Sequence, residues 1–310
     1  MSILISGGLG FIGSCLARKL VQENMDIVLF DISSDCKLIE DIKNEVEIVK
    51  GDLANKEAVQ NAVEKYNVKD IFHLGAVLSA FAETDPLRSF GVNFLGTINI
   101  LEAARIFNVR KVIYSSSVAA YGSNLPEPVV EDAPLKPLTV YGISKVFSEL
   151  WGLYYNRRYS IDFRALRLPS VVGPGRGLGG ASAYSTLIIQ KAALNEPYEI
   201  DVDEDATMPI MYYKDAVKAL LTLYNAKDPK SKIYNIAGIS PTAMDIVQEV
   251  KKHLPNAPLM FNPKPEIVSL IDSWPKALDD TKARQELGWH LTYTLDKLVV
   301  DFIKEVKSGQ

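Results

Sequence analysis

Residues 3–13 read Ile-Leu-Ile-Ser-Gly-Gly-Leu-Gly-Phe-Ile-Gly. A short apolar run that leads straight into glycines and then into a helical pattern predicts a strand, a tight turn and the start of a helix. Such a helix start binds pyrophosphate, because its free N–H groups and partial positive charge face the ligand and glycines let the backbone approach it. Gly8, Gly10 and Gly13 match the pattern G-x-G-x-x-G, and Gly7, Gly10 and Gly13 match G-x-x-G-x-x-G. An ordinary strand-to-helix turn is the alternative interpretation.

The alternation of strand and helix continues to about residue 168. Short runs rich in Ile and Val predict strands, and the longer stretches between them predict helices. Because the strands are apolar on both faces, they predict a parallel sheet covered by helices on both sides, which is a doubly wound α/β (Rossmann) fold. The expected strands are Ile3–Ser6, Asp26–Phe30, Val46–Val49, Asp70–Leu74, Lys111–Ser115 and Asp162–Leu168, and the expected helices are Phe11–Glu23, Lys56–Tyr66, Pro86–Phe107 and Tyr141–Tyr159.

The alternation of strand and helix ends after Leu168, and residues 173–180 are rich in glycine. Beyond that point we expect a smaller, partly discontinuous C-terminal substrate domain, with a helix at 214–224 and a strand at 233–236 returning to the main sheet. Further elements are expected as helices at 182–195, 240–254, 279–287 and 295–306 and a strand at 198–200. The predicted division is residues 1–168 with 213–238 for the dinucleotide-binding domain, and residues 169–212 with 239–310 for the substrate-binding lobe.

Composition excludes several classes of protein. The chain has 310 residues, a formal net charge of -4 and no evident stripe of Lys and Arg, so nucleic-acid binding is not favoured. With Cys15 and Cys36 as the only cysteines, and three histidines scattered along the chain, neither a structural disulfide nor a metal site is expected. No stretch reaches the length of a membrane span. We therefore expect a cytoplasmic protein that acts on a small molecule.

An acidic residue follows the glycine turn at the spacing that a nicotinamide cofactor requires. Asp31 ends the second expected strand, 21 residues after Gly10 (31 minus 10). A carboxylate there can accept both ribose hydroxyls of the adenosine half and repels a 2′-phosphate, and no arginine follows it, so NAD is predicted rather than NADP. Asp52 could meet the adenine edge, although Gly51-Asp52 is also a plausible turn. The small, apolar run at 74–76 suits close passage of the cofactor.

Tyr141 and Lys145 stand four residues apart, so their side chains share one face of the helix expected there. A tyrosine titrates at about pH 10, too high for a base at neutral pH, but a nearby ammonium and an oxidised nicotinamide ring both favour the phenolate. The phenolate could take the proton of a substrate hydroxyl while a hydride leaves the same carbon. Serines at 115–117 end the fifth expected strand, at the edge where ligands bind. Ser117 would hold the substrate oxygen, with Ser116 as the alternative.

The same tyrosine–lysine spacing occurs a second time, at Tyr293 and Lys297. No serine-bearing strand precedes that pair, so we interpret it as structural. The weight of the first pair therefore comes from the serines and the glycine turn around it rather than from its spacing.

Motifs along nearly the whole chain carry a family resemblance. They are Gly7-x-x-Gly10-x-x-Gly13, Asp31, Asp52-Leu53, His73–Ala76, Val92-Asn93, Ser115–Ser117, Tyr121-Gly122 and Tyr141-Gly142-Ile143-Ser144-Lys145. Together they resemble the extended short-chain dehydrogenase/reductase superfamily, which is also known as the NAD-dependent epimerase/dehydratase family. The resemblance implies a Rossmann domain with a small substrate domain, NAD as the cofactor, usually a homodimer, the second of the two glycine patterns, and Ser117, Tyr141 and Lys145 as catalytic residues. The expected cofactor-binding residues are Gly7, Gly10, Phe11, Ile12, Gly13, Asp31, Ile32, Asp52, Leu53, Leu74, Gly75, Ala76, Asn93, Ser115, Ser116, Tyr141, Lys145 and Leu168.

The segment at 207–215 indicates which members of this family the chain resembles most. Relatives that act on nucleotide sugars usually carry an arginine there that meets the diphosphate, whereas this chain has the apolar run Met208-Pro209-Ile210-Met211, which cannot neutralise a diphosphate. The run resembles that of short-chain-type L-threonine 3-dehydrogenases, as do the segments at 78–86, 273–280 and 287–289. Those enzymes typically show Gly-Thr-Thr-Asp-Tyr where this chain has Gly-Ala-Ser-Ala-Tyr at 180–184.

The sequence therefore predicts an NAD-dependent oxidoreductase that oxidises the secondary alcohol of a small polar substrate, with L-threonine as the first candidate and a sugar acid as the second. A nucleotide-sugar epimerase or dehydratase is the main alternative, and a non-catalytic NAD-binding protein is a further one. The expected substrate contacts are Ser79, Ser117, Ser182 and Trp274; Ser79, Ser182 and Trp274 could equally serve packing or capping.

Overall fold

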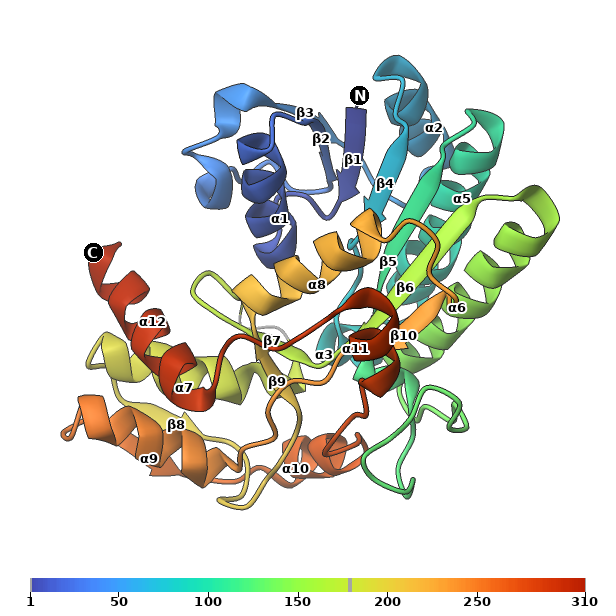
Figure 1. Ribbon diagram of the computed structural model, residues 1–310. Helices are drawn as coiled ribbons and strands as arrows, with labels where there is room; N and C mark the ends of the chain where they lie inside the picture. The colour runs from blue at the N-terminus through green and yellow to red at the C-terminus, as the bar shows by residue number, and fades with distance from the viewer. Residues whose placement is uncertain (1, 178–179, 310) are drawn as a thin grey trace.

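A seven-stranded parallel sheet forms the centre of the computed structural model, which describes residues 2–177 and 180–309 (Figure 1). The strand order is β10-β6-β5-β4-β1-β2-β3, and each neighbouring pair runs parallel. The chain order reverses on either side of β1, so the doubly wound fold is confirmed and a crevice is expected at the carboxyl ends of these strands. The strands are β1 (Ser2–Ser6), β2 (Asp26–Asp31), β3 (Val46–Lys50), β4 (Asp70–His73), β5 (Lys111–Ser117), β6 (Asp162–Leu168) and β10 (Ile233–Asn235).

Alternate side chains of the strands enter two separate cores. Ile3 and Ile5 of β1 pack into one core, and Leu4 between them packs into the other. Successive side chains of a strand point to opposite faces, so an unbroken apolar run fills both cores. The first core is covered by α1 (Phe11–Gln22), α8 (Tyr213–Asn225) and α11 (Thr281–Leu287), of which α1 and α8 lie side by side in Figure 1, and the second core is covered by α2 (Lys56–Lys65), α5 (Gly96–Ile106) and α6 (Val140–Tyr159).

A smaller set of elements packs around a core of its own beyond the carboxyl ends of the main strands. Two short parallel pairs, β7 with β9 and β8 with β11, support it. β10 pairs with β6 in the main sheet although Ile233 stands 65 positions after Leu168 (233 minus 168). The exact domain boundaries stay a prediction. The elements of the smaller set are β7 (Ser170–Val172), α7 (Tyr184–Ala193), β8 (Tyr198–Ile200), β9 (Ile210–Tyr212), α9 (Ala243–His253), β11 (Leu259–Phe261), α10 (Pro265–Asp272) and α12 (Leu295–Ser308).

The stretch predicted as one helix at 86–107 is divided in three. It comprises α4 (Pro86–Ser89), the π-helical η3 (Phe90–Leu95) and α5. A π-turn adds one residue to a helical turn, and a periodicity of 3.6 residues cannot reveal so small an insertion. The extra residue lies in the segment that carries Asn93.

Some short elements escaped prediction because three to eight residues hold too little of a repeating pattern. These are α3 (Ser79–Thr84), β7, β9, β11 and α10. Cys15 and Cys36 are free thiols. Within the described residues, no helix combines the length and the apolar character that crossing a bilayer requires.

Candidate active site

A cavity of about 330 Å³ opens at the carboxyl edge of the sheet. Its wall combines the glycine turn, the serines that end β5 and the start of α6 with residues of the smaller lobe. The fold thus gathers most of the predicted site residues in one place. Those that line the cavity are Gly7, Gly10, Phe11, Ile12, Gly13, Leu74, Ala76, Ser79, Ser115, Ser116, Ser117, Tyr141, Lys145, Leu168, Ser182 and Trp274.

At Gly7 and Gly13 the backbone of the glycine turn leaves no place for a larger residue. Gly7 has a φ of +69°, and a Cβ placed on Gly13 would lie 2.2 Å from the carbonyl oxygen of Gly7. Gly10 precedes the first residue of α1, and among the described residues no side chain caps this helix. The N–H groups at the start of α1 therefore remain available to an anion, as a dinucleotide's pyrophosphate requires.

Asp31 lies at the end of β2 beside this turn. Its Oδ2 accepts a hydrogen bond of 3.0 Å from Leu9 N–H, and its Oδ1 accepts one of 2.9 Å from Ser33 N–H. Each carboxylate oxygen has a second lone pair, so this fixed carboxylate can still accept ribose hydroxyls. Ile32, the next residue, is exposed. Neither residue lines the cavity around Tyr141, so any contact they make would be with the far half of an extended cofactor.

Asp52, Leu53 and Gly75 are not among the residues that line the cavity. Asp52 Oδ2 accepts a 2.8 Å hydrogen bond from Arg88 Nη1. Burial tends to raise the pKa of this carboxyl, but hydrogen bonding and the charge of Arg88 outweigh burial and lower the pKa. A contact with adenine would therefore share the carboxylate with Arg88. Leu53 packs beneath Gly75, where an added Cβ would lie 2.8 Å from Leu53 Cδ1.

Asn93 is buried and holds the loop that follows β4. Its Oδ1 accepts from Val77 N–H at 2.8 Å, and its Nδ2 donates to Val77 O at 3.0 Å and to Ser144 Oγ at 3.3 Å. The amide thus ties this loop to α6 and shapes the wall from behind. A direct cofactor contact by Asn93 stays a prediction.

Helix α6 begins where it does because Thr139 caps it, accepting a 3.0 Å hydrogen bond from Gly142 N–H. This start places Tyr141 in the first turn and Lys145 one turn further, both on the cavity wall. Lys145 Nζ lies 5.1 Å from the centroid of the Tyr141 ring and donates a 2.7 Å hydrogen bond to Ser115 O. Ser117 lines the same cavity.

The pKa values of Tyr141 and Lys145 both reflect their burial. Burial raises the pKa of Tyr141 to about 12, and the effects that oppose burial are the hydrogen bond from Ser117 and the charge of Arg176 rather than that of Lys145. Burial also lowers the pKa of Lys145 to about 7, although the charge of Glu149 opposes that shift. Burial therefore disfavours the charged form of the lysine, and the effect of its ammonium on the phenolate stays a prediction.

The geometry separates the two candidate serines. β5 extends to Ser117, two residues beyond its predicted end, and neighbouring side chains of a strand point to opposite faces. Ser116 Oγ donates a 2.5 Å hydrogen bond to Glu149 Oε1, which also binds buried Arg167. The Ser116 hydroxyl is thus engaged in the core, whereas Ser117 Oγ accepts a 3.2 Å hydrogen bond from Ala119 N–H and keeps its own proton to donate into the cavity. This arrangement favours Ser117 as the group that holds the substrate oxygen.

The substrate side of the cavity contains a cation that the sequence reasoning missed. Arg176 lines the cavity with Ser79, Ser182 and Trp274, and its Nη2 donates a 2.7 Å hydrogen bond to Ser182 Oγ. Arg176 stands within the glycine-rich segment at 173–180. The signal that could have drawn attention to it was a single arginine among breaker residues, next to the segment compared with Gly-Thr-Thr-Asp-Tyr.

The second tyrosine–lysine pair lies away from the cavity. Tyr293 precedes α12 instead of lying on a helix. Its hydroxyl donates a 3.3 Å hydrogen bond to Asp301 Oδ2. The structural interpretation of this pair therefore agrees with its position.

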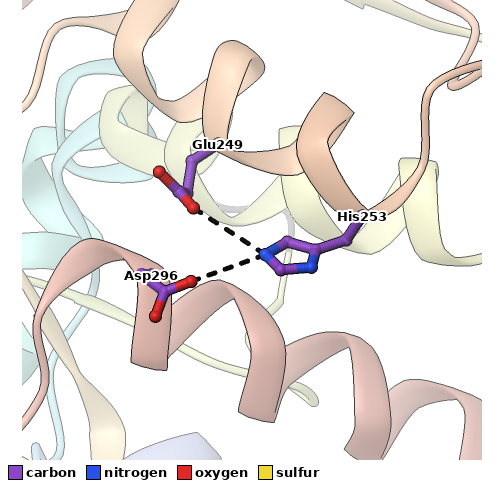
Figure 2. Close-up of side chains that lie close together, drawn as sticks. All are labelled: Glu249, His253 and Asp296. Carbon is purple, nitrogen blue, oxygen red and sulfur yellow. Dashed lines mark ion pairs between the residues drawn. The ribbon is translucent and has the colours of Figure 1, made fainter.

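One cluster outside the cavity joins two helices of the smaller lobe. Glu249 and His253 of α9 meet Asp296 of α12, and their ligand-type atoms lie within 4.8 Å of one another (Figure 2). His253 Nε2 lies 3.7 Å from Glu249 Oε1 and 3.5 Å from Asp296 Oδ1. Sequence spacing could not show this grouping, so the predicted absence of a metal site stays a prediction. None of the three lines the cavity.

Comparison with known proteins agrees with this geometry. The sequence profile of the NAD dependent epimerase/dehydratase family matches residues 3–237. Mitochondrial L-threonine 3-dehydrogenase of Bos taurus is 32% identical over 97% of this chain and 81% of its own length. L-threonine dehydrogenase of Clostridium difficile superimposes with a TM-score of 0.92 at 30% identity, over 99% of this chain and 98% of that one. UDP-glucose 4-epimerase of Thermotoga maritima, solved with UDP-glucose, gives a TM-score of 0.90 at 25% identity, over 100% and 99% of the two chains. The chain is an NAD-dependent enzyme and belongs to the NAD dependent epimerase/dehydratase family.

Proposed function

We propose that this protein is an NAD-dependent L-threonine 3-dehydrogenase, which oxidises the hydroxyl-bearing carbon of the amino acid. The observation that supports this proposal most directly is that Met208 and Pro209 of the apolar run line the same cavity as Tyr141. The substrate must lie in this cavity to reach the tyrosine. An apolar wall at this point suits a small substrate better than the diphosphate of a nucleotide sugar. The dehydrogenases of cattle and C. difficile support the same choice through their similarity over nearly the whole chain.

The residues of the glycine turn fit a dinucleotide, since a Cβ on Gly13 would fill the cradle. In this proposal the N–H groups of Phe11, Ile12 and Gly13 bind the pyrophosphate and Asp31 accepts the ribose hydroxyls. When bound, NAD supplies the carbon that accepts the hydride and a positively charged ring that favours the phenolate of Tyr141.

The proton chemistry falls to three side chains. Tyr141 takes the proton from the substrate hydroxyl, and Ser117 donates a hydrogen bond to the substrate oxygen and holds it in place. Ser117 and Arg176 already oppose the effect of burial on the pKa of Tyr141. Lys145 fixes α6 against β5 through its bond to Ser115 O. With a pKa of about 7, it is also suited to pass a proton onward at neutral pH.

The function is tested with purified protein, NAD and a panel of L-threonine, sugar acids and other small secondary alcohols. We expect NADH formation with L-threonine at a kcat/KM well above that of the other substrates. Turnover of a sugar acid alone would support the second candidate of the same reaction class, and no NADH with any substrate would contradict the proposal.

A nucleotide-sugar epimerase is the second candidate, favoured by the similarity to the T. maritima enzyme. The two enzyme classes share tyrosine chemistry but differ in what they bind. Calorimetry with UDP-glucose in the presence of NAD discriminates between them. The dehydrogenase proposal predicts no measurable binding of UDP-glucose, whereas micromolar affinity would favour the epimerase.

We also propose a homodimer. Large apolar side chains are exposed on α4, η3 and α6, including Leu87 at 85% and Leu150 at 59%. Stacked or tilted rings connect Phe90 through Phe94, Phe147 and Trp151 to Tyr154 on the same side of the molecule. A continuous exposed apolar surface of this kind is typical of a protein interface.

The proposed location is the cytoplasm. Cys15 and Cys36 are free and half-buried, as expected in a reducing compartment. Cell fractionation tests this location, and enrichment of the protein in an organelle or an extracellular fraction would contradict it.

A further inference from the structure

Arg176 lines the cavity with a guanidinium that the protein satisfies only in part. Its Nη1 donates to Ser170 Oγ and Val171 O, both at 3.0 Å, and to Thr186 Oγ1 at 3.4 Å; its Nη2 donates to Ser182 Oγ at 2.7 Å. A guanidinium carries five N–H donors, one of them on Nε. Among the described residues, Nε–H and one N–H of Nη2 have no acceptor.

Among the described residues, no carboxylate is paired with this cation. Its four acceptors are neutral oxygen atoms, and the described residues that line the cavity include neither Asp nor Glu. Burial lowers the pKa of Arg176 to about 10, with the charge of Tyr141 opposing that shift, so the side chain still carries a positive charge at neutral pH. Within the part of the cavity that the structure describes, this cation has no counter-ion.

Arg164 and Arg167, which are buried more completely than Arg176, each pair with a carboxylate. Arg167 pairs with Glu149 at 2.7 Å, and Arg164 pairs with Asp162 at 2.6 Å. A buried charge without a partner is costly, because desolvation is not repaid. A bound anion would thus supply the counter-ion that the described residues do not give to Arg176.

We propose that Arg176 binds the carboxylate of the substrate and thereby makes the enzyme specific for small 3-hydroxycarboxylates, an inference that rests on the dehydrogenase function proposed above. Nε and Nη2 are neighbouring nitrogens, so their two N–H groups can form paired, charge-assisted hydrogen bonds with one carboxylate. Tyr141 and Ser117 line the same cavity and would hold the hydroxyl. Two points of attachment then fix which carbon faces the cofactor.

Two other roles for Arg176 make different predictions. An arginine that merely holds the segment at 170–186 in place would, when replaced, impair every substrate alike. An arginine that binds a diphosphate would bind uridine diphosphate. A carboxylate contact is the role that changes the preference between an acid and its neutral amide.

The test compares L-threonine with L-threoninamide, which keeps the hydroxyl and the amine but has no carboxylate. We expect the native enzyme to prefer the acid by about 10- to 100-fold in kcat/KM. Arg176→Gln should reduce that preference to within about threefold, mainly through the KM for L-threonine, and Arg176→Lys should retain part of it. Arg158→Gln, at an exposed arginine of α6 outside the cavity, should leave the preference unchanged.

A binding measurement keeps the inference testable without turnover. Calorimetry with L-2-aminobutyrate, which lacks the reacting hydroxyl, should show at least about tenfold weaker binding to Arg176→Gln in the presence of NAD. If the native enzyme oxidises neither threonine compound, the proposed function fails while aminobutyrate binding still decides the role of Arg176. If the variant loses activity on acid and amide in equal proportion and binds aminobutyrate unchanged, the inference is overturned. It is also overturned if uridine diphosphate displaces aminobutyrate in an Arg176-dependent manner. Should Arg176→Gln fail to fold, Arg176→Lys supplies the same two comparisons.

Discussion

Lys145 Nζ donates a 2.7 Å hydrogen bond to the backbone carbonyl of Ser115, which fastens the helix that carries Tyr141 to the strand that carries Ser117. The lysine is almost completely buried, at 2% exposed. Because a strand and a helix hold the two reacting side chains, their separation is fixed before a substrate arrives. This contact is a positional role for the lysine, separate from any effect of its charge.

The burial of Lys145 predicts a dependence of stability on pH. Its pKa falls from 10.5 to about 7 because of burial, so between these values the unfolded chain binds a proton that the folded chain does not, and the free energy of unfolding rises with pH. The destabilising effect of burying the ammonium is complete below about pH 7 and fades toward pH 10.5. The free energy of unfolding of Lys145→Met, taken relative to that of the native protein, should therefore be roughly 1–3 kcal/mol higher at neutral pH than near pH 10. Urea unfolding of both proteins across this range measures the difference, and a constant difference would contradict the assignment.

Tyr141→Phe should lower kcat/KM by about 10²- to 10⁴-fold, because the general base is removed while the ring remains. The melting temperature should change little. Tyr293→Phe is the matched control, since Tyr293 has the same spacing to a lysine but lies outside the cavity. Turnover equal to the native rate in Tyr141→Phe, or equal losses in both variants, would show that Tyr141 is not the base.

Asp31→Ser should change the choice of cofactor. Removing the carboxylate removes an acceptor for the ribose hydroxyls and the repulsion of a 2′-phosphate, so the NAD-to-NADP ratio of kcat/KM should fall by at least about tenfold. Asp35→Asn, at an exposed position in the loop that follows β2, is the control and should leave the ratio unchanged. An unaltered ratio in Asp31→Ser would place the ribose elsewhere.

Glu149→Gln should destabilise the protein by about 3–5 kcal/mol, because it leaves buried Arg167 without its counter-ion. The two side chains are 1% and 5% exposed and 2.7 Å apart. Glu23→Gln breaks the exposed 3.9 Å contact with Lys19 and should cost less than about 1 kcal/mol. Chemical denaturation of both variants compares the two losses, and similar losses would contradict the importance of the buried pair.

Leu150→Glu should convert the proposed dimer to a monomer, because a charge would be placed within the exposed apolar surface of α6. Light scattering after gel filtration should show the native protein at twice its chain mass of 34.3 kDa and the variant at one chain mass. Lys304→Glu, on α12 and away from this surface, is the control. A native protein that is monomeric at micromolar concentration would contradict the proposal.

Local signals were enough to predict the centre of the fold. The glycine turn, Asp31 at the end of β2 and Tyr141 at the start of α6 each depend on neighbours within a few residues, so their placement follows from turn, strand and capping chemistry. Contacts between residues far apart in the sequence could not be predicted in this way. Arg176 enters the cavity because the chain folds back through the smaller lobe, and Glu249 meets Asp296 only where α9 packs on α12.

The choice between Ser116 and Ser117 shows the same limit on a finer scale. Three serines in a row carry no pattern that separates them. The choice became possible when the strand was found to extend through Ser117, since Ser116 then faces Glu149. The charge state of Lys145 was likewise inaccessible, because it depends on burial that spacing cannot measure.

In the proposed reaction, Tyr141 removes the proton of the L-threonine hydroxyl while a hydride leaves the carbon that bears it. The most direct measurement uses L-threonine deuterated at C3 with purified protein and NAD. We predict that the deuterium is recovered on the nicotinamide ring of the reduced cofactor, in an amount equal to the substrate oxidised, and that Tyr141→Phe nearly abolishes the transfer. Reduced cofactor without deuterium, or no reduction with L-threonine at any pH between about 6 and 10, would contradict the central claim.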